Sequence, residues 1–300
     1  MSTRMKIGIL GGDMRQGAVC TLFSLMDTEC AIWGSDLQEV NNTFCNYVRT
    51  VDWRDTLKGA TAVILPLPIT KDGVRLNCGK SVADLEAEMP RITEIIQATE
   101  RNTLLFGGKI PLNIRRFANE HNVKMIDYYE SEEFQIKNAV PTAEGAIGIA
   151  IRELNITLSG SRCAVVGYGR IGRTLATRLI SLGSQVTCIA RSKRDLAWAE
   201  CDGCNTLKLS EYKLSPLRQD VIFNTVPHMI FDSALLPKLD PGQLFIDLAS
   251  MNGGIDVDCA EKHGIRVVKA LSLPGKCSPI TAGKIIFDSV CEYMKEEGIL

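Results

Sequence analysis

The chain has 300 residues, of which 45% are hydrophobic and 23% charged, a composition typical of a globular protein with about two folded domains. Its 34 basic and 35 acidic side chains nearly cancel, which gives no support for a nucleic-acid partner. No secretory signal is visible, and the apolar run at residues 60–69 contains two prolines and is too short to cross a membrane. We therefore expect a cytoplasmic protein with neither a membrane nor a nucleic-acid partner.

The first half of the chain alternates short apolar runs with helical patterns. Five runs have the length and composition of buried strands, at residues 6–10, 30–33, 60–65, 103–106 and 123–126. Helices are expected between them, at residues 13–25, at residues 90–99 and from Pro111 onward. Strands that alternate with helices indicate a parallel sheet covered on both faces.

Residues 131–154 have a long helical pattern, which Pro141 is expected to interrupt. Six further strands are then predicted, at residues 163–166, 186–189, 205–207, 220–224, 244–248 and 265–268. Six strands in this rhythm are typical of the doubly wound dinucleotide-binding fold. The sequence thus predicts an α/β protein with mostly parallel sheets in four parts. These are an α/β substrate domain (1–140), a helical connector (141–158), a Rossmann domain (159–279) and a C-terminal helix (280–300), whose return to the first domain stays open.

The second domain begins with a Gly-rich dinucleotide fingerprint, Gly167-Tyr168-Gly169-Arg170-Ile171-Gly172. A buried strand precedes the motif and an amphipathic helix follows it, which is the context that the motif requires. Gly167 permits the tight turn, Gly169 lets the backbone approach a pyrophosphate, and Gly172 allows the helix to pack closely. The helix N-terminus would offer N–H groups to the phosphates. The alternative is a Gly-rich turn that binds nothing.

The end of the next strand distinguishes between the two nicotinamide cofactors. NAD enzymes usually carry Asp or Glu at this point, which accepts a hydrogen bond from the ribose 2′-hydroxyl. This chain has Ala190-Arg191-Ser192-Lys193 instead, and a guanidinium suits a 2′-phosphate. The nearest acid, Asp195, is expected in the first turn of the following helix. We therefore predict NADP as the cofactor and NAD as the less favoured one, with a solvated basic loop as the alternative.

Two loops at later strand ends extend the predicted cofactor site. Thr225-Val226-Pro227 follow the fourth strand of the second domain, and Asp247 and Ala249 follow the fifth. Ligands of doubly wound folds bind beyond these carboxyl ends. His228 is a candidate acid–base beside this loop, although a lone histidine is more often structural.

The first domain has its own Gly-rich turn, at Gly11-Gly12-Asp13. Its spacing does not match the fingerprint, and the Asp13 carboxylate would compete with a phosphate for the N–H groups of the following helix. We expect the turn to present Arg15 to a cleft between the domains, with an exposed helical Arg15 as the alternative. Thr142 is expected to begin a helix, either as its cap or as part of an anion site.

Four blocks of the sequence together resemble the dipicolinate synthase A-subunit family. They lie at residues 11–16 (GGDMRQ), 138–146 (NAVPTAEGA), 247–254 (DLASMNGG) and 273–283 (LPGKCSPITAG). The resemblance covers essentially the whole chain. It implies a sporulation enzyme of the bacterial mother cell that acts with a flavoprotein-like B subunit. The implied reaction is oxidation of a dihydrodipicolinate-type cyclic dicarboxylate to dipicolinate (pyridine-2,6-dicarboxylate), with hydride passing to NADP.

A dianionic substrate needs cationic or helix-end partners, which Arg15 and the Thr142 helix start would supply. The candidate substrate-binding residues are Asp13, Arg15 and Thr142. The candidate acid–base residues in the cleft are Lys109, Glu144 and Ser250.

Two other functions stay open at this point. One is an NADP-dependent dehydrogenase of another small acid, although no positioned His or Lys base is evident. The other is a non-catalytic NADP(H)-binding subunit. No metal site is predicted, because the Cys201–Cys204 pair has no second pair of ligands close in sequence. A homo-oligomer is compatible with the sequence.

Overall fold

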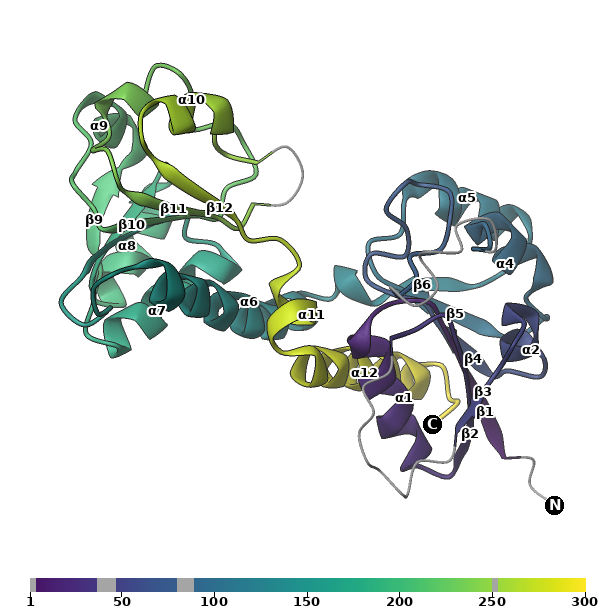
Figure 1. The fold of residues 1–300 in the computed structure, drawn as a ribbon. Helices are drawn as coiled ribbons and strands as arrows, with labels where there is room; N and C mark the ends of the chain where they lie inside the picture. The colour runs from purple at the N-terminus through teal and green to yellow at the C-terminus, as the bar shows by residue number, and fades with distance from the viewer. Residues whose placement is uncertain (1–3, 37–46, 80–88, 250–252) are drawn as a thin grey trace. The chain divides into compact units, whose positions relative to one another are not determined.

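The computed structural model describes residues 4–36, 47–79, 89–249 and 253–300. The chain divides into two compact units (Figure 1). The first comprises residues 1–135 and 278–300, and the second comprises residues 136–277. Each unit is built on one six-stranded sheet in which neighbouring strands run parallel.

The first sheet has the strand order β3-β2-β1-β4-β5-β6. Its strands are β1 (Met5–Leu10), β2 (Thr28–Trp33), β3 (Tyr47–Arg49), β4 (Ala62–Ile64), β5 (Leu104–Gly107) and β6 (Met125–Asp127). The sequence predicts all of these except β3. That strand has only three residues, and Val48 and Arg49 are exposed, so it has no apolar run to reveal it.

Helices cover both faces of the first sheet (Figure 1). Successive side chains along β1 point to opposite faces of the sheet. Ile9 packs in one core with α1 (Met14–Ser24) and α12 (Pro279–Glu296). Leu10 packs in the other core with α2 (Trp53–Leu57), α4 (Ile92–Ala98) and α5 (Leu112–Glu120). The C-terminal helix α12 therefore completes the core of the first unit. Its Phe287 ring lies 4.7 Å from that of Phe23 on α1.

The long helix α6 (Glu132–Glu153) corrects one expectation. It continues through Pro141 without a break, so the predicted interruption there is wrong. A proline inside a helix leaves one carbonyl without its usual donor. Burial of Ala139, Ala143 and Ala146 on one side of α6 stabilises the continuous helix despite that loss.

The second sheet has the strand order β12-β11-β10-β7-β8-β9. Its strands are β7 (Arg162–Val166), β8 (Gln185–Ala190), β9 (Asn205–Lys208), β10 (Val221–Asn224), β11 (Leu244–Asp247) and β12 (Arg266–Lys269). One face packs on α6 and α7 (Arg170–Ser181), and the other packs on α9 (Leu209–Leu214), η3 (Leu236–Lys238) and α10 (Val257–Lys262). The remaining helices are α8 (Lys193–Cys201) and α11 (Leu273–Cys277).

Both sheets follow the same topology. Numbered from the first strand of each unit, the order is 3-2-1-4-5-6, which is characteristic of dinucleotide-binding folds. The predicted α/β fold class, with a Rossmann-type second unit, is confirmed. In the described parts of the chain, no helix combines the length and apolarity needed to cross a membrane.

Candidate dinucleotide-binding site

The turn between β7 and α7 has the backbone geometry of a phosphate-binding loop. Gly167 adopts φ 91°, and a Cβ placed there would lie 2.6 Å from Thr225 Oγ1. A Cβ at Gly172 would lie only 2.1 Å from the Gly167 carbonyl oxygen. Both positions therefore require glycine, the first for conformation and the second for the close approach of the helix to the strand.

Gly169 differs from these two glycines, because the protein itself leaves room for a side chain there. It is the N-cap of α7, with φ −80° and ψ −165°, a conformation open to any residue. A Cβ at Gly169 would meet nothing within 4 Å. Open space therefore lies in front of the first N–H groups of α7, where a pyrophosphate would gain hydrogen bonds and the helix dipole.

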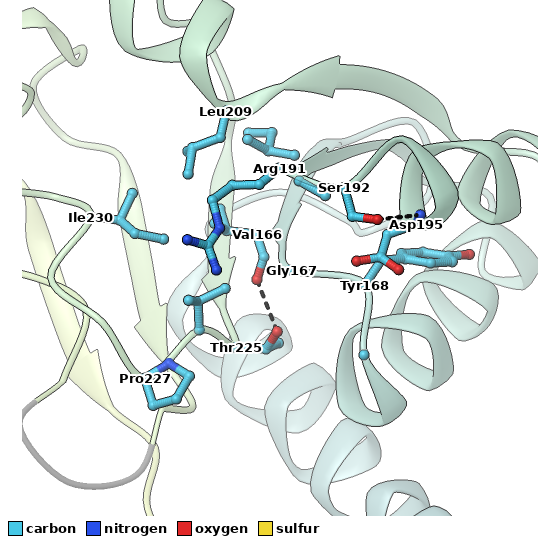
Figure 2. A pocket seen from close by; sticks show the side chains of 14 residues that line it. Val166, Gly167, Tyr168, Arg191, Ser192, Asp195, Leu209, Thr225, Pro227 and Ile230 are labelled. Carbon is cyan, nitrogen blue, oxygen red and sulfur yellow. Dashed lines mark hydrogen bonds between the residues drawn. The ribbon is translucent and has the colours of Figure 1, made fainter.

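A cavity of about 530 Å³ begins at this turn, at the carboxyl ends of β7, β8 and β10 (Figure 2). Its volume is in the range of small-molecule sites. The residues that line it are Val166, Gly167, Tyr168, Gly169, Ile189, Ala190, Arg191, Ser192, Asp195, Leu209, Thr225, Val226, Pro227 and Ile230. Nine of these residues are predicted cofactor-binding residues, from the Gly-rich motif and from the ends of β8 and β10. They are Gly167, Tyr168, Gly169, Ala190, Arg191, Ser192, Thr225, Val226 and Pro227.

Two charged side chains also line the cavity, those of Arg191 and Asp195. The exposed Arg191 follows β8, and Figure 2 shows its side chain directed into the cavity. Ser192 caps α8 by accepting a hydrogen bond from the Asp195 N–H at 3.4 Å. Asp195 lies in the first turn of α8, as predicted, and also lines the cavity. A cation suited to a 2′-phosphate thus shares the cavity with a carboxylate.

The remaining predicted cofactor residues do not line the cavity. Arg170 and Lys193 are the exposed first residues of α7 and α8, whereas Ile171 packs against the hydrophobic core of the second unit. Arg170 and Ile171 can therefore contribute backbone N–H groups at the helix start. Lys193 follows Arg191 by two residues and does not line the cavity.

A buried pair of side chains supports the loops after β10 and β11. Asn224 Nδ2 donates to Asp247 Oδ1 at 2.9 Å and to the Val226 carbonyl at 3.1 Å. The Asp247 carboxylate, whose residue is 2% exposed, also accepts the N–H groups of Ala249 and Gly254, each at 3.2 Å. Neither Asp247 nor Ala249 lines the cavity. Asp247 thus holds the backbone at Ala249 and Gly254, and its direct contact with a cofactor stays a prediction.

Sequence reasoning missed the apolar walls of the cavity. Leu209 and Ile230 are buried, lie in the hydrophobic core of the second unit and line the cavity. Leu209 is the first residue of α9 and Ile230 belongs to the loop after β10. No motif marks them, because their position depends on strand order rather than on neighbouring residues. Apolar walls of this kind suit a flat heteroaromatic ring.

In comparisons with known proteins, each unit matches the model of a family. Residues 6–129 match the family described as the N-terminal domain of the dipicolinate synthase A subunit. Residues 142–252 match the NAD-binding domain of D-isomer-specific 2-hydroxyacid dehydrogenases. The dipicolinate synthase A subunit of Bacillus subtilis is 30% identical over 297 residues, which cover 99% of this chain and 98% of that protein. The chain belongs to the dipicolinate synthase A-subunit family.

Solved structures agree with this assignment. The A chain of Bacillus subtilis dipicolinate synthase has a TM-score of 0.82 at 29% identity, covering 99% of this chain and 97% of that chain. The corresponding protein from Bacillus halodurans has a TM-score of 0.81 at 28% identity, with 97% of each chain covered. An L-alanine dehydrogenase, 14% identical with a TM-score of 0.67, shares the fold alone. The second unit is thus an NAD(P)-binding domain of dehydrogenase type in a member of the dipicolinate synthase A-subunit family.

The Gly-rich turn of the first unit differs from the dinucleotide turn of the second, because an acidic side chain lies at the start of its helix. Asp13 is the N-cap of α1 and accepts a hydrogen bond from the Arg15 N–H at 3.1 Å. The Arg15 guanidinium also binds both Asp13 carboxylate oxygens and the Leu67 carbonyl. The Arg15 side chain is only 8% exposed, so the alternative of an exposed helical arginine is wrong.

The ionisation of Asp13 reflects this pairing. Burial by itself would raise the pKa of the Asp13 carboxyl, but the hydrogen bonds and the charge of Arg15 outweigh burial and hold that pKa below its usual 3.8. The Asp13 carboxylate is therefore charged at neutral pH and faces the N–H groups that an incoming anion would need.

Thr142 does not begin a helix, which corrects a second expectation. It lies in the interior of α6, and its hydroxyl donates to the Asn138 carbonyl at 2.8 Å. Backbone N–H groups at this point are used by the helix itself. The predicted anion site at Thr142 is therefore wrong, because it requires a helix N-terminus and none begins at this residue.

The candidate acid–base residues have diverse surroundings. Lys109 is exposed, and its ammonium lies 4.8 Å from the centre of the Tyr129 ring. Glu144 is exposed on α6, with Oε1 3.5 Å from Arg178 Nε. Ser250 lies outside the described residues. His228 is exposed after β10. Lys109 belongs to the first unit and Glu144 to the second, so a cleft that both would share stays a prediction.

Proposed function

We propose that this chain is the NADP-dependent oxidoreductase component of a dipicolinate synthase. In this proposal it oxidises a dihydrodipicolinate-type cyclic dicarboxylate to dipicolinate. The observation that carries the proposal is similarity over 99% of the chain to a dipicolinate synthase A subunit. The open turn at Gly169 and the adjoining cavity support it, because they supply the hydrogen-bond donors and volume that a dinucleotide needs.

The reaction removes two hydrogens from the substrate ring. One leaves a ring carbon as hydride with its electron pair, and the other leaves the neighbouring ring atom as a proton. When bound, NADP supplies the ring that accepts the hydride. The product gains aromaticity, so the protein's main tasks are to align the donor carbon, exclude water and accept one proton.

NADP is the proposed cofactor because of the residues after β8. Ala190 cannot accept a hydrogen bond from a ribose 2′-hydroxyl, and Arg191 enters the cavity as a donor for a phosphate. Asp195 opposes a phosphate through its charge and favours a free 2′-hydroxyl. In this proposal the Arg191 guanidinium, which is directed into the cavity, is the group that favours NADP, and Lys193 follows it two residues along the chain.

The substrate and partner assignments belong to the same proposal. Asp13 and Arg15 are the proposed substrate-binding residues in the first unit, with Arg15 as the group that attracts a dicarboxylate. Lys109, Glu144 and Ser250 are the proposed acid–base candidates. A separate dipicolinate synthase B subunit is the proposed partner, and a sporulating mother cell the proposed location, both by analogy with the Bacillus subtilis protein.

An assay of pyridine absorbance tests the proposal. The purified chain is mixed with a source of dihydrodipicolinate and NADP, with and without the B subunit, and formation of dipicolinate and NADPH is followed together. Equal amounts of both products are expected in the complete mixture, since one hydride is transferred per ring oxidised. Absence of dipicolinate from the chain and the B subunit together would refute the proposal.

The match of residues 142–252 to 2-hydroxyacid dehydrogenases favours a second candidate, an NADP-dependent dehydrogenase of another small acid. The same assay distinguishes the two candidate functions. NADP reduction with a panel of 2-hydroxy acids, but not with dihydrodipicolinate, would select the second. A chain that binds NADPH but reduces NADP with neither substrate, alone or with the B subunit, would be a non-catalytic binding component.

A further inference from the structure

The middle residue of the dinucleotide turn lines the cavity and is anchored by a residue that does not. The Tyr168 residue is 6% exposed, and its hydroxyl donates to Asp202 Oδ2 at 2.9 Å. Asp202 is the C-cap of α8. The same carboxylate also binds Arg173 of α7, with Nε 2.8 Å from Oδ2 and Nη2 3.2 Å from Oδ1. One carboxylate thus connects the turn with both following helices.

An aromatic contact reinforces this connection. The Arg173 guanidinium carbon lies 4.6 Å from the centre of the Trp198 ring on α8. We call Tyr168, Arg173, Trp198 and Asp202 together the Tyr168 clamp. Its bonds between charged partners are stronger than neutral hydrogen bonds, and the cation–π contact adds to them. The clamp therefore fixes the Tyr168 side chain more firmly than packing alone.

The position of Tyr168 in the chain gives the clamp a consequence for ligand binding. Tyr168 lies between Gly167, which permits the tight turn, and Gly169, whose backbone would approach the pyrophosphate. Glycines have the greatest backbone freedom, and a loop that must be ordered on binding loses affinity. Anchoring the residue between them orders the turn before any ligand arrives.

The Tyr168 hydroxyl keeps its proton, and with it the hydrogen bond of the clamp, at neutral and mildly alkaline pH. Burial, and after it the hydrogen bond to the Asp202 carboxylate, raise the pKa of the Tyr168 hydroxyl. The hydroxyl therefore remains a donor at neutral and mildly alkaline pH. The effect of the clamp should accordingly be independent of pH in that range.

We propose that Tyr168 is a positioning residue that preorganises the Gly167–Gly169 turn for a pyrophosphate through its hydrogen bond to Asp202. This inference rests on the proposed function of the second unit as a dinucleotide site. It assigns Tyr168 a role that is separate from the choice between NADP and NAD, because Arg191 reaches the cavity from β8 and is not a member of the clamp.

Tyr168→Phe tests the inference, because it removes only the hydroxyl and keeps the ring in the core. Tyr212→Phe is the matched control. Tyr212 is buried in the same unit, and within the described part of the chain its hydroxyl has no hydrogen-bond partner. Dissociation constants are measured by fluorescence titration for NADPH and NADH. Displacement of NADPH then gives the constants for ADP-ribose, which carries the pyrophosphate, and for adenosine 2′-monophosphate, which does not.

In Tyr168→Phe, we expect NADPH, NADH and ADP-ribose each to bind about tenfold more weakly, which corresponds to about 1.4 kcal/mol. Adenosine 2′-monophosphate should bind as it does to the wild type, and Tyr212→Phe should change none of the four constants. A general loss of stability would weaken all four ligands alike and would lower the melting temperature, which is measured in parallel.

Two results would overturn the inference. One is binding of all three pyrophosphate ligands by Tyr168→Phe within about twofold of the wild type, against the tenfold change expected. The other is an equal loss for adenosine 2′-monophosphate. Failure of the wild type to bind NADPH or NADH at all would refute the proposed dinucleotide site as well, so the two failures are distinguishable.

Discussion

The two units of the chain share a topology but differ at the equivalent turn. Each has six parallel strands in the order 3-2-1-4-5-6, and in each a Gly-rich turn connects the first strand to a helix. In the first unit Asp13 caps that helix with its own carboxylate, and Gln16 crowds Gly12 so that a Cβ there would lie 2.3 Å from Gln16 Oε1. In the second unit the cap is Gly169, and the space before it is open.

This difference shows that topology alone does not make a dinucleotide site. A helix N-terminus binds an anion only when its N–H groups are free. In the first unit the Asp13 carboxylate accepts the Arg15 N–H, whereas in the second unit the cap, Gly169, has no side chain that could occupy the helix start. The fold thus provides two similar frameworks, and the side chains at the cap determine which one is suited to a pyrophosphate.

The largest change in NADPH binding is expected when a side chain is added inside the Gly-rich turn of the second unit. Gly172→Ala places a methyl group 2.1 Å from the Gly167 carbonyl oxygen, which must move. We expect the free energy of unfolding to fall by about 1–3 kcal/mol. NADPH binding should fall by about two orders of magnitude, because several phosphate hydrogen bonds are misaligned. Denaturant titration and fluorescence titration measure the two effects.

Gly169→Ala provides the matched variant for that experiment. Its methyl group would meet no protein atom within 4 Å, and the backbone conformation suits alanine. Stability should therefore be unchanged, while NADPH binds at least about tenfold more weakly because the methyl group occupies the pyrophosphate position. Unchanged NADPH affinity in Gly169→Ala would show that the ligand binds elsewhere.

The next effect concerns the charge at the end of β8. Arg191→Ser removes the guanidinium that enters the cavity and leaves the turn intact. NADPH affinity should fall by about 10- to 100-fold, the value of a charge-assisted contact to phosphate, while NADH affinity changes by less than about twofold. The ratio of the two dissociation constants is the informative quantity. An equal loss for both cofactors would contradict the assignment of Arg191 to a 2′-phosphate.

The smallest effect is expected in the first unit. Asp13→Asn keeps a capping side chain but removes the charge paired with Arg15. At pH 7 the free energy of unfolding should fall by about 0.5–1 kcal/mol, a value discounted for screening because the Asp13 side chain is 38% exposed. NADPH should still bind to one site per chain, because Gln16 continues to crowd the turn.

The pH dependence of that difference follows from the lowered pKa of Asp13. A carboxyl group with a folded-state pKa below its unfolded value contributes stability above the unfolded value of about 3.9. That contribution is lost as the pH falls through the folded-state pKa. Unfolding free energies of wild type and Asp13→Asn should therefore converge below about pH 4. A difference that grows in acid would mean that Arg15 does not stabilise the Asp13 carboxylate.

The dinucleotide turn was predictable from the sequence because its requirements are local. Gly167, Gly169 and Gly172 are adjacent in the chain to the strand and helix that they join, and the close approaches at Gly167 and Gly172 leave no room for larger residues. The same holds for Asp195, which the cap at Ser192 places in the first helical turn. The longer strands were predictable from their apolar runs for a similar reason. Both faces of a covered parallel sheet are buried, so nearly every residue of such a strand is apolar.

Other features depend on contacts between distant residues and could not be predicted in this way. Pro141-Thr142 has the local signature of a helix start, yet packing of the α6 alanines keeps the helix continuous. The cavity walls at Leu209 and Ile230 depend on which strands are neighbours. The bond from Tyr168 to Asp202 joins residues 34 positions apart, and no spacing rule connects them.

Calorimetric titration of the 300-residue chain with NADPH and with NADH measures both the number of binding sites and the cofactor preference. We expect one NADPH per chain, bound at least about tenfold more tightly than NADH, as a single charge-assisted phosphate contact would give. Two NADPH molecules per chain would contradict the contrast between the two turns. Equal or tighter binding of NADH would contradict the role of Arg191.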